Sequence, residues 1–210
     1  MSTPSMTLFH SPSSPFVRKV MVLLHETGQL DRVATNTVTV SPVSPDSGLN
    51  QDNPAGKLPA LRLADGSVLH DSRVILDYLD HQHTGTPLIP REVPARWRRL
   101  TLASLADAIL DAAVLIRYET FLRPAEKHWD LWLENQQEKI ERTLAYLERD
   151  GIKELSSSFD IAAISVACAL GYLDFRMPTL GWRARQPQLA QWYAEVSQRP
   201  SLKATEPPTA

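Results

Sequence analysis

The first eighty residues alternate between short apolar runs and a helical pattern. A short apolar segment at residues 6–11 predicts a strand. From Phe16 onward, apolar side chains recur at spacings of one, three and four, which predicts a helix that ends near Gly28. β-Branched side chains at residues 33–40 predict a second strand. Residues 41–57 are rich in Ser, Pro, Asn, Asp and Gly, and this composition predicts a loop.

A hairpin and a further helix complete this part of the chain. The segments LPALRL and SVLH flank the turn sequence ADG, which indicates two short antiparallel strands. Asp71 and Ser72 then open a helix whose apolar side extends from Val74 to Leu79. The order strand, helix, strand, hairpin and helix predicts a small α/β domain.

Only helical patterns follow residue 95. Residues 96–122 form a long apolar helix rich in alanine, and residues 126–149 carry a single apolar stripe. Residues 188–198 predict a last helix. These patterns predict an all-helical second domain.

The apolar segment that begins with SSFD predicts the centre of this second domain. It is apolar almost all round, which is typical of a buried helix. Ser157 and Asp160 have the spacing of a capping box, with Asp in place of the usual Glu. We therefore expect an α/β domain at residues 1–83, a proline-rich linker at 84–95 and an all-helical domain at 96–210.

Composition and charge narrow the class of protein. The chain has 210 residues, of which 43% are hydrophobic and 22% charged, with a net charge of −2, so we expect a folded core and no nucleic-acid partner. No apolar run reaches the roughly 18 residues that a membrane helix needs. The start MSTPSM lacks the pattern of a signal peptide. We therefore expect a cytoplasmic protein that binds neither nucleic acid nor a membrane.

Two serines precede Pro15 at the start of the first helix, although a helix cap needs only one hydroxyl. Ser14 fits the N-cap and Pro15 the first helical position. A second role for one hydroxyl is to face a negatively charged ligand, because a helix N-terminus favours an anion. Asp71 and Ser72, at the start of a later predicted helix, likewise either cap that helix or bind a charged ligand.

Other candidate groups do not predict a metal or nucleotide site. His81 and His83 are two residues apart, whereas helical ligands need a separation of three or four. The chain lacks a glycine-rich phosphate loop, and its single cysteine, Cys168, excludes an internal disulfide. Asp107 and Asp111 lie on one helix face, where we expect a polar stripe or a subunit contact rather than a pair of acid–base catalysts.

Five segments together resemble one known family. They are SSPFVRKVMVLL at the first strand–helix junction, NPAGKLPAL at 53–61, LHDSRVILDYL at 69–79, SSFDIAAI at 157–164 and WYAEVSQRPS at 192–201. In this order and spacing, essentially the whole chain resembles a cytosolic glutathione transferase, and bacterial members with serine or cysteine at the first helix are the most similar. The resemblance implies a thioredoxin-like first domain and a helical-bundle second domain. It also implies a homodimer through the second domain's first two helices.

The resemblance further implies that glutathione is a co-substrate, without a metal, and that the protein holds its sulfur as a thiolate. A free thiol has a pKa of about 8.5, so a hydroxyl donor at a helix N-terminus favours the reactive anion. Ser14 aligns with the residue in this role, and Phe16 lies beside it in the glutathione site. Ser13 is the competing candidate and Ser11 a more distant one. Simple helix capping is the alternative role of Ser14.

The remaining glutathione contacts are implied in the same way. The backbone of Leu58, which precedes a cis Pro59, would pair with the ligand's cysteine like an added strand. Lys57 is the candidate for the ligand's glycine carboxylate, with Gln51 or Asn53 as alternatives in the same loop. The γ-glutamyl end would place its ammonium on Asp71 and its carboxylate at Ser72 and the helix N-terminus.

The second substrate is expected to be a small hydrophobic electrophile. Arg117, Tyr118 and Phe121 are candidates for its pocket by position, as is Phe16, and simple packing is the alternative role of each. The expected reaction is substitution or conjugate addition by the thiolate. Two alternative functions are a glutathione-dependent thiol–disulfide oxidoreductase or peroxidase, which normally needs a cysteine where this chain has serine, and a non-catalytic glutathione-binding protein.

Overall fold

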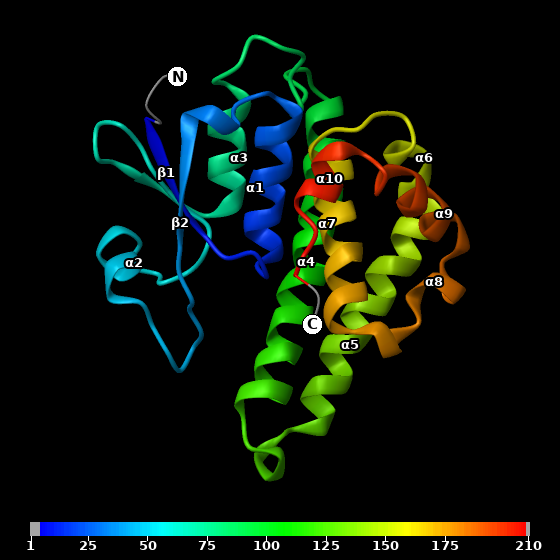
Figure 1. The fold of residues 1–210 in the computed structure, drawn as a ribbon. Helices are drawn as coiled ribbons and strands as arrows, with labels where there is room; N and C mark the ends of the chain where they lie inside the picture. The colour runs from blue at the N-terminus through cyan, green and yellow to red at the C-terminus, as the bar shows by residue number, and fades with distance from the viewer. Residues whose placement is uncertain (1–4, 209–210) are drawn as a thin grey trace. The chain divides into compact units, whose positions relative to one another are not determined.

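The computed structural model describes residues 5–208, and these residues form two compact units (Figure 1). The first unit consists of residues 5–87 and 200–208, and the second of residues 88–199. The expected division assigned the whole of 96–210 to the helical domain, whereas residues 200–208 pack with the first unit.

The first unit is built on a four-stranded sheet in the order β2-β1-β3-β4. Strand β1 is parallel to β2 and antiparallel to β3, and β3 is antiparallel to β4. The strands are β1 (Met6–His10), β2 (Val33–Thr37), β3 (Ala60–Arg62) and β4 (Val68–Leu69). This mixed sheet confirms the predicted α/β class and its thioredoxin-like topology.

Two helices of the first unit, α1 (Pro15–Glu26) and α3 (Ser72–Asp80), pack against each other, and Figure 1 shows them on the same side of the sheet. The 3-10 turn η1 (Leu30–Arg32) follows α1 and leads into β2. The predicted helix start and stop are confirmed, because Ser14 is the N-cap of α1 and Gly28 has a φ of 65°, in the left-handed region that favours glycine.

A short helix, α2 (Ser47–Asp52), lies in the segment predicted to be a loop. The Asp46 carboxylate caps it by accepting a hydrogen bond from the Leu49 N–H at 2.7 Å. Leu49 is fully buried and packs with Phe9 and Ala60. A single turn fixed by one cap and one buried side chain is too short to show a helical period in the sequence.

The C-terminal helix α10 (Pro200–Ala204) joins the first unit by packing against α1. The buried Arg18 of α1 donates from Nη2 to the carbonyl oxygen of Leu202 at 3.1 Å. The hydroxyl of Ser201 also donates to the carboxylate of Glu26. These contacts explain why this segment does not belong to the helical unit.

The second unit is all-helical, as predicted. Helix α4 (Ala95–Leu122) packs against both α5 (Asp130–Tyr146) and α7 (Ile161–Arg176), and these helices lie alongside α4 in Figure 1. Every side chain of α7 from Ile161 to Leu173 is buried, which confirms its central position. The other elements are η2 (Ala125–Lys127), η3 (Leu147–Gly151), α6 (Ile152–Leu155), η4 (Pro178–Leu180), α8 (Trp182–Arg185) and α9 (Pro187–Val196).

The predicted capping box at Ser157 and Asp160 is wrong in its assignment of roles. Helix α7 starts at Ile161, and Asp160 is itself the N-cap, accepting from the N–H of Ala162 at 3.0 Å. Ser157 instead donates to the Glu154 carbonyl at 2.9 Å and lies outside the helix.

The buried Arg99 of α4 explains this arrangement. Its Nε lies 2.8 Å from Asp160 Oδ2, and its Nη2 donates to the hydroxyls of Ser157 and Ser158 at 2.6 Å each. Arg99 therefore fixes both the cap residue and the two serines before it.

Among residues 5–208, no single helix is both long and apolar enough to cross a membrane. Helix α7 passes the length and composition test only jointly with residues 178–185, and the two are bent by 98°.

Candidate active site

The sheet of the first unit brings the ends of three segments to one edge. Strands β1 and β3 are antiparallel with Phe9 opposite Ala60, so the end of β1 and the start of β3 lie together. Leu61 is opposite Leu69, so β4 also ends at this edge. The loop into α1, the turn at Pro59 and the start of α3 therefore meet there.

Ser14 lies at this edge as the N-cap of α1. Its Oγ accepts a hydrogen bond from the Val17 N–H at 3.3 Å. A serine hydroxyl has two acceptor lone pairs and one proton, and capping uses only a lone pair. Ser14 can therefore cap the helix and still donate its proton to an anion, so the two roles considered for it are compatible.

The neighbouring serines are bound to each other. The hydroxyls of Ser11 and Ser13 lie 3.3 Å apart, within hydrogen-bonding distance. Since either hydroxyl can be the donor, Ser13 still has donor capacity. Ser14 differs from Ser13 because only the Ser14 hydroxyl accepts a hydrogen bond from the N-terminus of α1.

Lys19 is a residue of this region that the sequence analysis missed. Its side chain is only 1% exposed, and its Nζ lies 5.4 Å from the centre of the Phe16 ring. Its positive charge is also one of the smaller causes that lower the pKa of Asp71. The sequence signal that could have indicated a buried charge was the position of this lysine between the apolar residues Val17 and Val20.

The peptide bond between Leu58 and Pro59 is cis, as the resemblance implied. Asn53, one alternative ligand for glutathione, is buried and committed to the loop: its amide donates to the Lys57 carbonyl at 2.8 Å, and its Oδ1 accepts from the Ala55 N–H at 3.1 Å. Lys57 itself is exposed, and so is Gln51.

Asp71 is the N-cap of α3 and is also bound by Arg73. Its Oδ1 accepts from the Arg73 N–H at 3.0 Å, and its Oδ2 lies 2.7 Å from Arg73 Nη2. The hydrogen bonds from the Arg73 side chain are the largest cause of a lowered pKa for Asp71. Ser72, the first residue of α3, is 3% exposed.

His10 is a second residue that the sequence analysis missed. It is the last residue of β1, directly before the loop that carries Ser14. Among the described residues, its buried Nδ1 has no hydrogen-bond partner. Burial lowers the pKa of the ring, so the neutral form is favoured.

Of the four residues predicted for the electrophile pocket, Phe16 lies on α1, and the other three lie on the C-terminal part of α4 in the second unit. The Arg117 guanidinium lies 3.6 Å from the centre of the Phe121 ring. Tyr118 is half-buried, and burial raises the pKa of its hydroxyl. Helix α7 adds two residues that the sequence analysis missed, Tyr172 and Arg176, which both interact electrostatically with Arg117.

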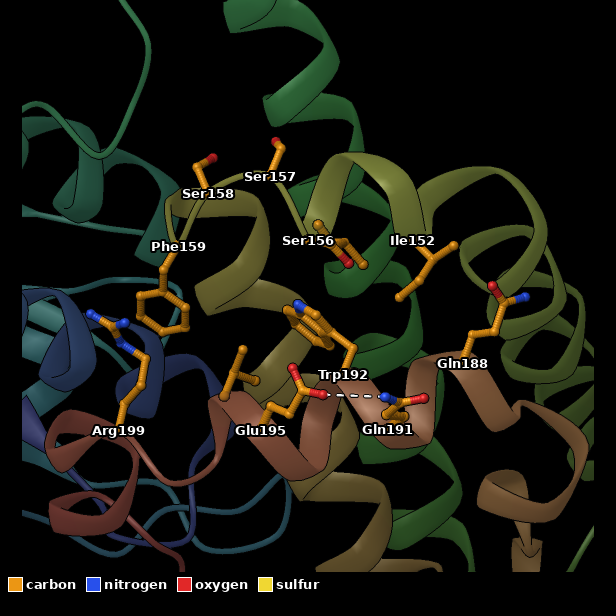
Figure 2. A pocket seen from close by; sticks show the side chains of 12 residues that line it. Ile152, Ser156, Ser157, Ser158, Phe159, Gln188, Gln191, Trp192, Glu195 and Arg199 are labelled. Atoms are coloured by element: carbon orange, nitrogen blue, oxygen red, sulfur yellow. Dashed lines mark hydrogen bonds between the residues drawn. The ribbon is translucent and has the colours of Figure 1, made fainter.

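A separate groove of about 530 Å³ lies in the second unit between the segment 152–159 and helix α9. Figure 2 shows Trp192 in its lining and the ring of Phe159 facing the Arg199 side chain, which lies 4.0 Å from the ring centre. None of the predicted site residues lines this groove. It is therefore distinct from the candidate site.

The described residues hold no group of three or more His, Cys, Asp or Glu side chains that could bind a metal ion. His83 Nε2 instead lies 3.3 Å from Asp80 Oδ1. Cys168 is buried in α7.

The fold defines a class of two-domain protein, in which a thioredoxin-like domain with an anion-favouring edge accompanies an all-helical domain. Family models for the N-terminal and C-terminal domains of glutathione S-transferase match residues 8–87 and 130–195. The GST-like protein YibF of Escherichia coli (strain K12) is 35% identical over 98% of this chain and 100% of its own length. The chain therefore belongs to the glutathione transferase family, which confirms the resemblance.

Solved structures agree with this assignment. A glutathione transferase family member from Pseudomonas fluorescens Pf-5, with bound glutathione, is 69% identical with a TM-score of 0.97, and the match covers 98% of this chain and 100% of that one. A second structure from the same organism, with bound S-(propanoic acid)-glutathione, is 67% identical with a TM-score of 0.92, over 97% and 100% of the two chains.

Proposed function

We propose that this protein is a glutathione transferase that activates the thiol of glutathione as a thiolate and joins it to a small electrophile. The observation that carries this proposal is the geometry of Ser14. Its oxygen caps α1 by accepting from Val17, and its proton is available to the ligand's sulfur. The N-terminus of α1 adds a partial positive charge at the same point. Both effects favour the thiolate.

The other contacts follow the edge of the sheet. We assign the ligand's cysteine backbone to Leu58, beside Pro59, and its glycine carboxylate to Lys57. Asp71 takes the ammonium of the γ-glutamyl end, and the start of α3 at Ser72 takes the carboxylate. The lowered pKa of Asp71 is consistent with this role, since the carboxylate then stays charged to lower pH than an ordinary aspartate. The relative from Pseudomonas fluorescens Pf-5, solved with bound glutathione, supports the same ligand.

The reaction needs no covalent intermediate on the protein. The thiolate attacks an electrophilic carbon and forms a C–S bond. In substitution, the leaving group departs with its bonding electrons; in conjugate addition, the neighbouring carbon takes up a proton. The protein contributes orientation and stabilisation of negative charge on sulfur. We place the electrophile against Arg117, Tyr118 and Phe121 of the second unit.

Calorimetric titration with glutathione tests the binding step. We expect binding by the wild type and weaker binding by Asp71→Asn, because the ammonium loses its counter-ion. Asp77→Asn, on the same helix, is the matched control for loss of one negative charge and should bind like the wild type. Absence of binding by the wild type contradicts the proposal.

Turnover of a chlorinated dinitrobenzene tests the transfer step. A transferase releases chloride and forms the aryl–sulfur conjugate. A thiol–disulfide oxidoreductase would instead reduce a mixed disulfide without forming that conjugate. The position of Cys168 does not favour this alternative, because its side chain is buried in α7.

We also propose that the protein is a homodimer joined through α4 and α5. Helix α4 exposes the large apolar side chains of Trp97 and Leu115, and α5 exposes Leu131. Exposed apolar side chains of this size are typical of interaction surfaces when they gather on neighbouring elements. Light scattering should give twice the chain mass, and a monomer mass contradicts the proposal.

The proposed role is detoxification of electrophiles in the cytoplasm, where glutathione is the principal thiol buffer. Cells that lack the protein should then accumulate unconjugated electrophile.

A further inference from the structure

Two arginines of the second unit lie on helices that pack against each other, and the charge of one acts on the other. Arg117 is in the C-terminal part of α4, and Arg176 is the last residue of α7, which packs along α4 (Figure 1). The Arg117 guanidinium lies 3.6 Å from the Phe121 ring centre, and that of Arg176 lies 3.7 Å from the Phe175 ring centre. Each guanidinium makes a cation–π contact with one ring, and this contact does not use the N–H donors of the guanidinium.

Two tyrosine hydroxyls accompany these guanidinium groups. Tyr172 interacts electrostatically with Arg176, Arg117 and Tyr118. Burial is the largest cause of the raised pKa of both tyrosines. Both hydroxyls therefore keep their protons at neutral pH, so each can act as a donor.

The two positive charges lack an acidic partner among residues 5–208. The nearest acids in the sequence are already paired, because Glu119 binds Arg123 at 2.8 Å and Asp174 binds Arg183 at 2.7 Å. After burial, repulsion from Arg176 is the next cause that lowers the pKa of Arg117. An anionic ligand would offset this repulsion.

We propose that Arg117, Arg176, Tyr118 and Tyr172 form an anion site that selects electrophiles bearing a carboxylate. This inference rests on the proposed transferase function and names the class of its second substrate. A guanidinium presents two parallel N–H groups that match the two oxygens of a carboxylate. The rings of Phe121 and Phe175 contribute apolar surface for the carbon skeleton attached to that carboxylate.

Two glutathione conjugates that differ only in charge test the site. S-carboxyethylglutathione carries a carboxylate where S-carbamoylethylglutathione carries an amide of nearly the same size. Calorimetry should show that the wild type prefers the carboxylate conjugate by about tenfold, equivalent to ~1.4 kcal/mol. We expect Arg117→Gln and Arg176→Gln to lose this preference. Arg142→Gln removes the same charge from α5 of the second unit and should keep it.

A kinetic comparison extends the test to catalysis. A chlorodinitrobenzoate and its carboxamide both lose chloride when the thiolate attacks the chlorine-bearing carbon, and both form one C–S bond. The kcat/KM for the benzoate should fall in the two arginine variants, whereas that for the carboxamide should change little. Arg117→Lys keeps the charge but loses the paired donors, so it should show an intermediate preference and also guards against a variant that fails to fold.

The outcomes separate this inference from the proposed function. Equal affinity of the wild type for the two conjugates, or a preference that survives in both glutamine variants, overturns the anion site and leaves glutathione binding intact. Failure of both conjugates to bind overturns the proposed function, and the anion site falls with it.

Discussion

The carboxylate of Asp71 is bound by the guanidinium of Arg73 two residues later, with Arg73 Nη2 2.7 Å from Asp71 Oδ2. The same carboxylate accepts the Arg73 N–H as the cap of α3. An incoming ammonium would therefore share a carboxylate that is already ion-paired. Arg73 thus lowers the pKa of the group proposed to bind the γ-glutamyl end of glutathione.

Replacing Arg73 should raise the pKa of Asp71. Arg73 lowers this pKa in the folded protein, so the wild-type carboxylate stays charged to lower pH than an ordinary aspartate. In Arg73→Gln, Asp71 should take up its proton at higher pH, and glutathione binding should fade at correspondingly higher pH on the acid side. Carboxyl NMR titration measures the shift. Arg62→Gln removes an arginine paired with Asp52 and is the matched control; an unchanged Asp71 titration in Arg73→Gln contradicts the prediction.

Ser14→Ala should separate binding from activation. The variant loses the hydroxyl donor but none of the proposed contacts to the tripeptide's ends, so glutathione affinity should stay within a few-fold. Turnover should fall, and bound glutathione should form its thiolate at higher pH, which ultraviolet absorbance of the thiolate measures. Loss of the cap should also cost about 0.5–2 kcal/mol of stability.

Ser13→Ala is the control for this experiment. It removes a hydroxyl from the same loop but leaves the cap of α1 in place. If the thiolate titration moves in Ser13→Ala and not in Ser14→Ala, the role belongs to Ser13.

Arg99→Met should strongly destabilise the second unit. Its guanidinium is buried against the Asp160 carboxylate and the hydroxyls of Ser157 and Ser158. Removal of one partner of a buried ion pair typically costs about 3–5 kcal/mol, because the remaining charge is left uncompensated. Arg98→Met is the neighbouring control, since its side chain is 55% exposed, and exposed pairs contribute about 0–1 kcal/mol. Urea unfolding should separate the two variants; equal midpoints contradict the prediction.

Leu202→Ala should destabilise the first unit although it lies near the end of the described chain. The side chain is 1% exposed in α10, and truncation of a buried leucine to alanine costs about 2–5 kcal/mol. Lys203→Ala changes the adjacent exposed residue and should have little effect. Thermal unfolding compares the two, and a Leu202→Ala variant as stable as Lys203→Ala would show that α10 contributes nothing to the unit.

The elements that the sequence predicted correctly are those with a repeated local pattern. Helices α1, α3 and α7 each show several apolar positions in helical register, and the hairpin has a strong turn signal between its strands. The sequence did not predict helix α2, because only one buried leucine, Leu49, and one cap define it. The start of α7 was placed too early because Arg99, far away in the sequence, determines which acidic or hydroxyl group becomes the cap.

The residues of the candidate site also divide into those that local sequence predicted and those that only the folded chain reveals. Ser14 and Asp71 follow from capping motifs at element boundaries, whereas the cis bond before Pro59 was implied only by the family resemblance. Lys19 was missed because it lies within a predicted helix, where a single charged residue is interpreted as part of the solvent face. Arg176 was missed because the apolar segment that predicted α7 ends before it. Their surroundings come from other segments, so only the folded chain reveals them.

The return of α10 to Arg18 has a consequence for biosynthesis. Arg18 is synthesised early, but its carbonyl acceptor at Leu202 leaves the ribosome some 184 residues later in the chain. Domains commonly fold as they emerge, from the N-terminus onward. Here the unit translated first is completed last, after every helix of the other unit has been made.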